Sequence, residues 1–339
     1  MRNLPRHILV VRLSSLGDVA ILAPILLEFK RKYPKRKISV LTKNEFAPLF
    51  SFIESINIIP IDFKADFRGL LGLVKLSLKI KTLKVDAILD LHNVLRTKIL
   101  KLLLNNIPFR VINKGRDEKK QLIQGKIFHQ LDSTIERYIR VFADFGFNLS
   151  MKEPAFPPPK KLPPRVTKML KGYKKPYIGI APFAAHGSKI YPLLKMEKVI
   201  SALSKTNTVI LFGAKGNESK ITQQISREFS NVVSVAGRFA LDEELILMSH
   251  LSVMLSMDSG NAHMAAMMGI NVVTLWGVTH PYAGFIPYNQ PMDNCLVADR
   301  ERFPKVPTSV YGDKYPKGYE KAIWTISEQD IIEVITKKF

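Results

Sequence analysis

The stretch from residue 253 to residue 269 constrains the fold of this chain most strongly. An apolar run over 253–257 is followed by the turn Asp258-Ser259-Gly260 and then by an alanine-rich helical stretch that ends at Gly269. A second apolar run, over 272–276, follows at once. This order predicts the βαβ unit of a parallel sheet. The turn would place backbone N–H groups at a helix N-terminus, which suits a phosphate, although an ordinary turn with Asp258 as N-cap fits equally well.

The rest of the chain repeats this alternation of strands and helices. With 339 residues it is long enough for two domains. Apolar runs predict strands over 7–13, 37–42, 86–91, 109–113, 177–181, 208–212, 232–236, 253–257 and 272–276, and periodic stretches predict helices over 19–32, 69–83, 94–104, 193–205, 218–229 and 241–249. We therefore predict an α/β fold of two doubly wound domains that face a central cleft.

A proline-rich segment marks the boundary between these domains. Six of the twelve residues over 153–164 are proline, which excludes a helix or a central strand and predicts a stiff linker. The predicted division is an N-terminal domain over 1–155, a linker over 156–172, a second domain over 173–320 and a C-terminal helix over 321–339. Ser327 is expected to cap that helix.

Charge is concentrated in the first half of the chain. Residues 1–165 hold 31 Lys and Arg against 14 Asp and Glu, a net charge of +17 out of +22 for the whole chain. Nucleic acid, an anionic membrane surface or a phosphorylated substrate would each exploit this excess, and a merely solvated basic surface remains the alternative. No helix-turn-helix, zinc-finger or aromatic-stacking motif is present, so we expect no nucleic-acid partner.

Composition also indicates the compartment. The single cysteine, Cys295, excludes an internal disulfide and is compatible with a reducing environment. Arg12 and Asp18 interrupt the first apolar run, which argues against a signal peptide, and no apolar run is long enough to cross a bilayer. A cytoplasmic protein is expected, with peripheral contact with the inner surface of the membrane. The basic apolar stretch over 67–81 could lie on that surface, but packing of one face on the sheet is the favoured interpretation.

Common cofactor motifs are missing from the sequence. There is no Gly-x-Gly-x-x-Gly and no Gly-x₄-Gly-Lys-Ser/Thr, which argues against a dinucleotide oxidoreductase and a P-loop enzyme. There is also no Asp-x-Asp and no cluster of His and Cys, so neither a catalytic metal nor another cofactor is expected.

Two further turns carry candidate chemistry. Ser14 to Asp18 follows the first strand, where open α/β sheets bind ligands. Asp18 is either a helix N-cap or a base, and Ser14 and Ser15 are the better caps. Lys189, in a loop after the first strand of the second domain, is either a solvated lysine or a point charge that would neutralise a diphosphate.

These motifs together resemble those of glycosyltransferase family 9, the ADP-heptose:lipopolysaccharide heptosyltransferases and their relatives. The resemblance covers about residues 7–285 and is carried by Ser14-Ser-Leu-Gly-Asp18, Lys189-x-Tyr-Pro192, Phe212-Gly213 and Asp258-Ser-Gly-x-x-His263-x-x-Ala. The chain departs from the family pattern at Val278-Thr-His-Pro281, where Pro-Thr-Asp-Pro is common, and at Ala184 and Ala185, where hydroxyl residues are common.

The resemblance implies a GT-B fold and metal-independent, inverting sugar transfer. The sugar is expected to be heptose, the donor an ADP-linked nucleotide sugar, and the acceptor an anionic glycolipid, the phosphorylated core or lipid A of lipopolysaccharide. Asp18 would deprotonate the acceptor, and Lys189 with the N–H groups of Ser259 and Gly260 would stabilise the leaving diphosphate. The donor-binding residues would be Ser14, Ser15, Gly17, Ser188, Phe212, Gly213, Glu218 (ribose), Phe239 (base), Asp258, Ser259, Gly260 and His263. The acceptor contacts would be His92, Arg96 and Arg137.

Two other functions remain compatible with the sequence. One is a GT-B relative that uses or epimerises another nucleotide sugar. The other is a non-catalytic basic protein that binds a membrane, which predicts that no nucleotide binds and that Asp18→Asn leaves function intact.

Overall fold

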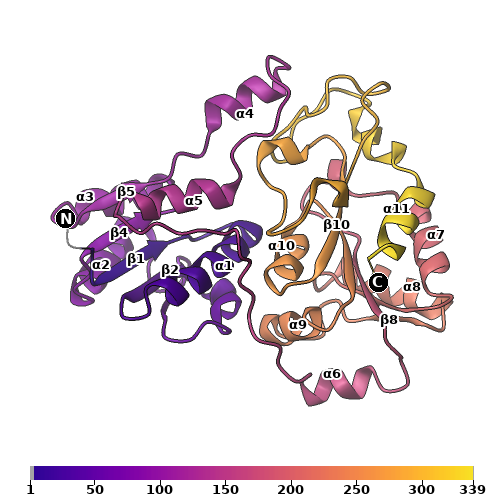
Figure 1. The fold of residues 1–339 in the computed structure, drawn as a ribbon, viewed down its shortest axis with the longest axis horizontal. Coiled ribbons are helices and arrows are strands. Elements are labelled where there is room, and N and C mark those ends of the chain that lie inside the picture. The colour runs from indigo at the N-terminus through magenta and orange to yellow at the C-terminus, as the bar shows by residue number, and fades with distance from the viewer. Residues whose placement is uncertain (1–3, 339) are drawn as a thin grey trace. The chain divides into compact units, whose positions relative to one another are not determined.

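The computed structural model describes residues 4–338, and the chain divides into two compact units. Unit 1 comprises Met1–Lys114 and Thr134–Pro157, and unit 2 comprises Gly115–Ser133 and Pro158–Phe339. The predicted boundary at residue 155 therefore misses one excursion, because Gly115–Ser133 clusters with unit 2 although it lies within the predicted N-terminal domain. Figure 1 shows the course of the chain through the elements of each unit.

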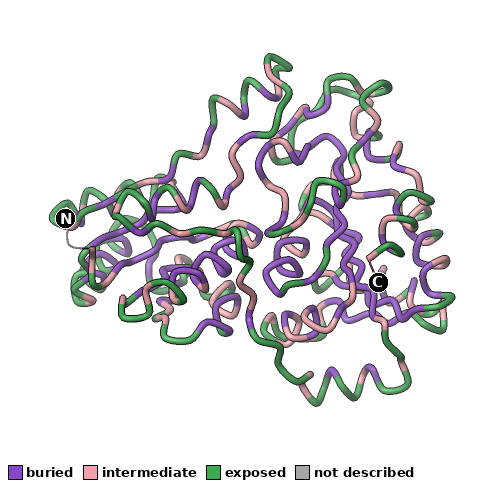
Figure 2. The backbone as a smooth tube through the Cα atoms, in the orientation of Figure 1, coloured by how far each residue is buried: buried purple, intermediate pink, exposed green. Residues whose placement is uncertain are grey.

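Unit 1 is built on a parallel sheet of five strands in the order β3-β2-β1-β4-β5. The strands are β1 (His7–Val11), β2 (Lys37–Lys43), β3 (Asn57–Ile61), β4 (Ala87–Asp90) and β5 (Phe109–Val111). All of β4 and all but the first residue of β1 are buried, as the purple tube in Figure 2 shows for the centre of the sheet. Strand β3 was not predicted, because it is an edge strand whose apolar run is interrupted by Pro60.

The helices of unit 1 are α1 (Leu16–Lys32), α2 (Gly69–Thr82), α3 (Leu95–Leu103) and α5 (Thr134–Ala143). The 3-10 turn η1 (Asn44–Phe50) packs with α1. One core cluster joins the inner side chains of α2 and α3, among them Leu73, Leu76 and Leu100, to the sheet. This confirms that α2 packs one face on the sheet. Gly72 lies so close to the backbone of Phe67 that a Cβ there would clash, at 2.1 Å from a backbone carbon.

Unit 2 is built on a six-stranded parallel sheet in the order β11-β10-β9-β6-β7-β8. Its strands are β6 (Tyr177–Ala181), β7 (Thr208–Leu211), β8 (Val232–Ser234), β9 (Val253–Met257), β10 (Asn271–Trp276) and β11 (Cys295–Val297). Its helices are α6 (Pro164–Met169), α7 (Leu193–Leu203), α8 (Asn217–Glu228), α9 (Leu241–Met248), α10 (Gly260–Met267) and α11 (Glu328–Thr336). The predicted strands and helices of this half are present, whereas the short edge strand β11 was missed.

The excursion Gly115–Ser133 carries α4 (Arg116–Ile123) and packs on the 281–285 region of unit 2. Leu122 and Leu131 bury their side chains against Ala283, and the Leu131 N–H donates to the Tyr282 carbonyl at 2.9 Å. These contacts join residues as far apart in the sequence as Leu131 and Tyr282, and local periodicity cannot predict such a pairing.

The ends of the second half differ in detail from the predictions. The short helix α6 begins at Pro164, the last residue of the proline-rich segment, and lies within the predicted linker over 156–172. Ser327 caps α11 as predicted, because its hydroxyl accepts from the Asp330 N–H at 3.0 Å. Over residues 4–338, no helix is both long enough and apolar enough to cross a membrane.

Candidate active site

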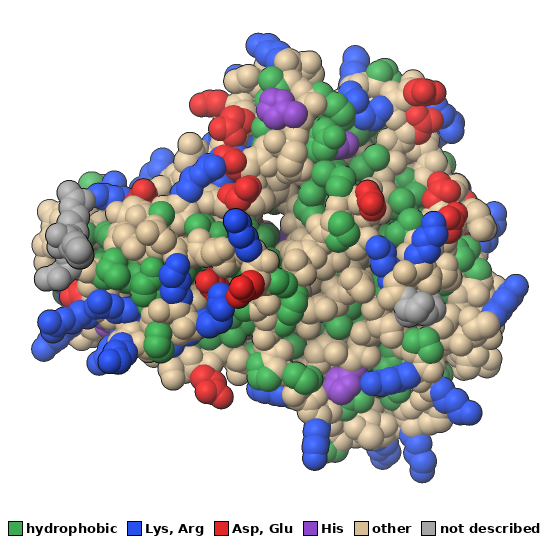
Figure 3. Space-filling view, viewed as in Figure 1, with side chains coloured by type: hydrophobic (Ala, Val, Ile, Leu, Met, Phe, Trp, Pro, Cys, Tyr) green, Lys and Arg blue, Asp and Glu red, His purple; other side chains and the backbone are tan. Residues whose placement is uncertain are grey.

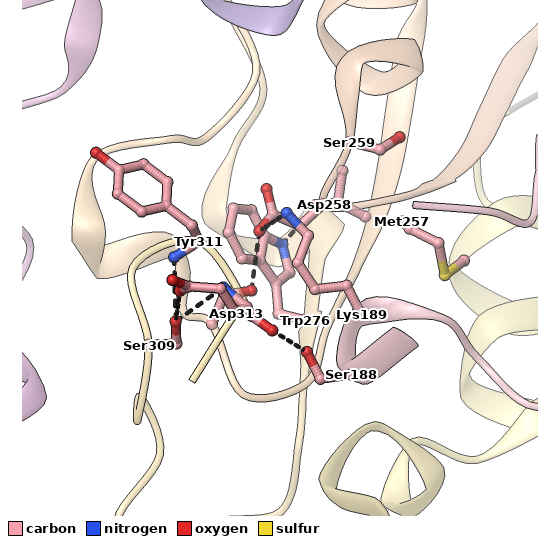
Figure 4. Close-up of polar contacts among 12 residues, drawn as sticks. Ser188, Lys189, Met257, Asp258, Ser259, Trp276, Ser309, Tyr311 and Asp313 are labelled. Carbon is pink, nitrogen blue, oxygen red and sulfur yellow. Dashed lines mark hydrogen bonds and ion pairs between the residues drawn. The ribbon is translucent and has the colours of Figure 1, made fainter. Parts of the chain in front are cut away.

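The strand order of unit 2 brings Lys189 and Asp258 together. Strands β6 and β9 are neighbours in the sheet, and the chain leaves them toward opposite edges, so a topological switch point lies between them. Ligands of open α/β sheets bind at the carboxyl ends of the strands at such a point. The loop after β6 holds Lys189, and the turn after β9 holds Asp258. Their side chains form an ion pair of 2.9 Å (Lys189 Nζ to Asp258 Oδ2), with 12% and 10% of the side chains exposed. Figure 4 shows the two side chains pointing toward one another.

The turn between β9 and α10 distinguishes the two roles considered for Asp258. The N-cap of α10 is Ser259, not Asp258. The Asp258 carboxylate instead accepts a hydrogen bond from Thr279 at 2.9 Å in addition to the ion pair with Lys189. The ordinary N-cap hypothesis is therefore wrong. Asp258 fixes the position of a nearly buried cation beside the N-terminus of α10.

A segment that the sequence analysis left unassigned completes this side of unit 2. The Ser188 hydroxyl donates to the Gly312 carbonyl at 2.6 Å. Gly312 has φ +88°, and a Cβ there would lie 2.6 Å from Lys189 Cδ. The Ser309 hydroxyl donates to Asp313 at 2.9 Å and lowers the pKa of that carboxyl. Figure 4 shows this 309–313 loop beside Lys189. The buried Ser188 side chain thus links the loop after β6 to the 309–313 loop, and its hydroxyl is used in a hydrogen bond within the protein.

The other predicted donor residues of unit 2 lie at the carboxyl ends of β7 and β8 and on α10. Glu218, in the first turn of α8, accepts from the Ala214 N–H at 2.8 Å beside Gly213. Phe239 is partly exposed, with the Arg165 guanidinium 5.8 Å from its ring centre. Phe212 is only 1% exposed, so its side chain belongs to the core. His263 is buried on α10.

Asp18 lies in the predicted turn after the first strand of unit 1, but its carboxylate is engaged by neighbouring side chains. Helix α1 begins at Leu16 with Ser15 as its N-cap, so Gly17 and Asp18 lie in the first turn. The Asp18 carboxylate accepts from the Ser15 hydroxyl at 2.8 Å and forms an ion pair with Arg12. Ser15 is the cap, as predicted, but this does not leave Asp18 unengaged, because the cap hydroxyl donates to the Asp18 carboxylate. Arg12 is buried and also donates to the Leu91 carbonyl at 2.6 Å.

The switch point of unit 1 lies between β1 and β4, and it brings Ser14 next to His92. The Ser14 hydroxyl and His92 Nε2 are 3.2 Å apart. Burial, with the positive charge of Arg12, lowers the pKa of His92 to about 3, so the imidazole is neutral at pH 7. Of the three predicted acceptor residues only Arg96 is exposed, with its guanidinium 4.8 Å from the Phe63 ring centre. The other two are buried: Arg137 lies on α5, and His92 follows β4.

The two switch points therefore bring together four of the residues that the family resemblance implied, Lys189 with Asp258 and Ser14 with His92. The model of glycosyltransferase family 9 (heptosyltransferase) matches residues 73–315 of this chain, a range that includes Lys189 and Asp258. The chain belongs to glycosyltransferase family 9. It is accordingly a glycosyltransferase, and the non-catalytic alternative is excluded.

Similarity to individual members of this family extends over most of the chain. The chain is 23% identical over 316 residues to the lipopolysaccharide core heptosyltransferase OpsX of Haemophilus influenzae, covering 89% of this chain and 87% of that protein. It is 26% identical over 282 residues to lipopolysaccharide heptosyltransferase 3 of Escherichia coli K12, covering 78% and 80%.

Solved structures of family members share the fold. A family 9 glycosyltransferase from Veillonella parvula superposes with a TM-score of 0.77 at 18% identity, covering 98% of this chain and 97% of that one. E. coli heptosyltransferase WaaC with ADP superposes with a TM-score of 0.70 at 16% identity, covering 98% and 100%. These similarities confirm the GT-B fold class with its two Rossmann-like domains.

One departure of this glycosyltransferase from the family pattern has a structural explanation. His280, where the pattern has Asp, caps the 3-10 turn η3 (Pro281–Ala283), because its Nδ1 accepts from the Tyr282 N–H at 3.2 Å. Its ring also packs against Phe128 and Tyr282, with ring centres 5.2 and 4.4 Å away. A neutral imidazole thus provides the hydrogen-bond acceptor that a carboxylate would provide, in an apolar setting where a charge would be costly.

Burial of His280, reinforced by Arg300, lowers its pKa to about 4. The unfolded chain therefore takes up this proton near pH 6.5 and the native protein only near pH 4, so the contribution of His280 to stability is full above about pH 6.5 and is lost as the pH falls. Between about pH 7 and pH 5 we expect a loss on the order of 2 kcal/mol in the free energy of unfolding from this group.

The measurement is urea unfolding of the wild type and of His280→Asn, which keeps a capping acceptor, at both pH values. Burial raises the pKa of Glu244 to about 7, and this group acts in the opposite direction over the same range. Glu244 is present in both proteins, so its contribution cancels when the pH-dependent change in the free energy of unfolding of the variant is subtracted from that of the wild type. An equal loss of stability in the two proteins would contradict the assignment.

Proposed function

We propose that this chain transfers a heptose from ADP-heptose to the core or lipid A region of lipopolysaccharide, with inversion at the anomeric carbon and without a metal. The observation that carries the proposal is the ion pair between Lys189 and Asp258 at the switch point of unit 2. A lysine held there, beside a helix N-terminus, has the charge and position needed to bind a diphosphate.

The donor assignment draws on the relatives as well as on the site. Two solved structures of E. coli heptosyltransferase WaaC, one with ADP and one with ADP-2-deoxy-2-fluoro heptose, share the fold of this chain. The curated relatives are named as lipopolysaccharide heptosyltransferases. In this proposal Phe239 and Glu218 lie on the nucleoside side of the donor, and Lys189 lies on the diphosphate side.

The acceptor is assigned to unit 1. Its excess of Lys and Arg favours a phosphorylated glycolipid over a neutral one. Arg96 is the exposed cation among the three predicted contacts, whereas His92 and Arg137 would support the acceptor site from within the unit. We expect the reaction to take place in the cytoplasm.

The proposed chemistry is a single displacement. Asp18 takes the proton of the acceptor hydroxyl as its oxygen attacks the anomeric carbon, and the bond to the diphosphate oxygen breaks with its electron pair on the leaving ADP. Lys189 and the N-terminus of α10 stabilise the negative charge on that diphosphate, which is the role that a divalent metal would otherwise fill. Arg12 and Ser15 hold the Asp18 carboxylate in position.

The test is transfer from ADP-heptose to heptose-free lipopolysaccharide in the presence of EDTA. We expect full activity without added metal, and a product whose anomeric configuration is opposite to that of the donor by NMR. A strict requirement for a divalent metal would overturn the metal-independent mechanism. Retention of configuration would overturn the role of Asp18 as the base in a single displacement.

A further inference from the structure

Helix α2 exposes an apolar face that the core of unit 1 does not cover. Its inner positions, including Leu73, Leu76 and Ile80, are buried, whereas Leu70, Leu71 and Leu78 are 63%, 84% and 57% exposed. Positions 70, 74 and 78 are four residues apart and therefore share one side of the helix, with position 71 adjoining them. The helix thus has two apolar faces, of which one packs on the sheet and the other meets solvent.

The neighbouring helix α3 also exposes leucines. Its Leu95 and Leu102 are 74% and 75% exposed and lie seven residues apart, on one side of a helix that packs against α2. Among the described residues, six leucines are more than half exposed, and five of them lie on α2 and α3. The sixth, Leu194, stands alone on α7 of unit 2. Such a concentration is unusual for a surface that meets only water.

The charges around these leucines have a single sign. The sequence contains no Asp or Glu over 67–85 or over 91–115. The lysines and arginines on or beside the two helices are exposed: Arg68, Lys75, Lys79, Lys81, Arg96, Lys98 and Lys101. Figure 3 shows hydrophobic side chains bordered by Lys and Arg side chains at the part of unit 1 where α2 lies. We call the exposed leucines and these cations the α2–α3 face.

We propose that the α2–α3 face binds the surface of an anionic lipid bilayer. Exposed leucines flanked by lysines and arginines match the two layers of such a surface, because the leucines can enter the acyl boundary while the cations stay among the anionic headgroups. Two of these cations are on α2 itself, where Lys75 Nζ and Lys79 Nζ lie 5.6 and 5.7 Å from the ring centre of Phe67. Packing of α2 on the sheet is therefore compatible with binding of α2 to a membrane surface, because the two use opposite faces of the helix.

Other occupants fit this face less well. Nucleic acid would use the cations but would leave the leucines in water. A second copy of the chain would bring the same cations against each other, because a two-fold interface pairs a surface with itself. An anionic bilayer satisfies both the apolar and the charged components, and it requires neither the donor nor the acceptor of the proposed transfer.

The experiment is cosedimentation of the full chain with vesicles of phosphatidylglycerol and phosphatidylethanolamine, compared with vesicles of phosphatidylcholine. We expect preferential binding to the anionic vesicles. Leu71→Gln/Leu78→Gln should weaken that binding by about ten-fold or more, because two inserted leucines are lost. Leu194→Gln, which changes a leucine that is 77% exposed on unit 2, is the matched control and should bind as the wild type does.

A second readout reports insertion directly. The fluorescence of Leu71→Trp should shift to shorter wavelength when anionic vesicles are added, whereas that of Leu194→Trp should not. Both variants carry the same background from Trp276 and Trp324. Equal binding to both kinds of vesicle, unchanged binding of the double variant, or no shift in Leu71→Trp would each overturn the proposal. So would a dimer in sedimentation equilibrium that the double variant abolishes while its vesicle binding is unchanged.

Discussion

Asp18→Asn is expected to reduce kcat by about a thousand-fold, while the affinity for the donor nucleotide stays within a few-fold of the wild type. The reason is that an amide can still accept the hydrogen bond from Ser15 but cannot take a proton from the acceptor hydroxyl, and general-base catalysis contributes about 10²–10⁴ to a rate. The measurement is the steady-state rate of transfer together with calorimetric titration of the nucleotide. Both are needed, because the prediction is a loss of turnover without a loss of binding.

The control for this substitution is Asp86→Asn. Asp86 lies in the same unit, just before β4, where its carboxylate accepts from the N–H groups of Arg6 and His7 at 2.8 Å each. The same chemical change there should leave kcat unaltered. Thermal unfolding of Asp18→Asn must also be measured, because Arg12 loses its charged partner. A folded Asp18→Asn with a wild-type rate would show that Asp18 is a structural residue of the first turn of α1.

Lys189→Ala is expected to weaken nucleotide diphosphate binding and to lower kcat/KM together, the latter by about 10²–10³. The substitution removes the cation opposite the diphosphate and leaves the nearly buried Asp258 carboxylate without its ion pair. That carboxylate would then repel the ligand. The prediction is checked by titration with ADP and by transfer kinetics on the same preparation.

Two further variants separate electrostatics from structure at this position. Lys189→Ala/Asp258→Asn removes both charges, so it should recover part of the binding lost in Lys189→Ala if repulsion by Asp258 contributes. Lys195→Ala is the matched control, because Lys195 lies on α7 and pairs with Glu328 at 3.2 Å. An equal loss of ADP affinity in Lys195→Ala would show that any lysine of this region has the same effect.

The sequence predicted the fold well where an element has its own periodic pattern. The strands β6 and β9 have the predicted bounds, and α2 differs from its prediction by one residue at its end. The short edge strands β3 and β11 were missed because their few side chains give little pattern. The helices α4 and α5 were missed as well, although α5 buries residues at helical spacing. The excursion Gly115–Ser133 was assigned to the wrong unit because its partners at 281–285 are remote in sequence.

In the candidate site too, the sequence predicted individual residues but not their partners that are remote in sequence. Motifs located Asp18, Lys189 and Asp258, because each follows a strand at the carboxyl edge of a sheet. The partners of these residues could not be read from local sequence: Arg12 lies within the preceding strand region, and Thr279 and Gly312 come from an irregular segment. One signal was available, since Gly312 lies between polar residues in a stretch that composition alone marks as loop. The burial of the Phe212 and Ser188 side chains could not be predicted either, because burial of a side chain is a tertiary property.

The most direct test of the account is calorimetric titration of the wild type with ADP, UDP, GDP and CMP in EDTA, with Lys189→Ala alongside. The account predicts that ADP binds selectively without metal and that this binding is lost in the variant. Preference for another nucleotide would keep the site and contradict the ADP donor. Binding that requires a divalent metal, or that survives unchanged in Lys189→Ala, would contradict the central claim that Lys189 holds the diphosphate.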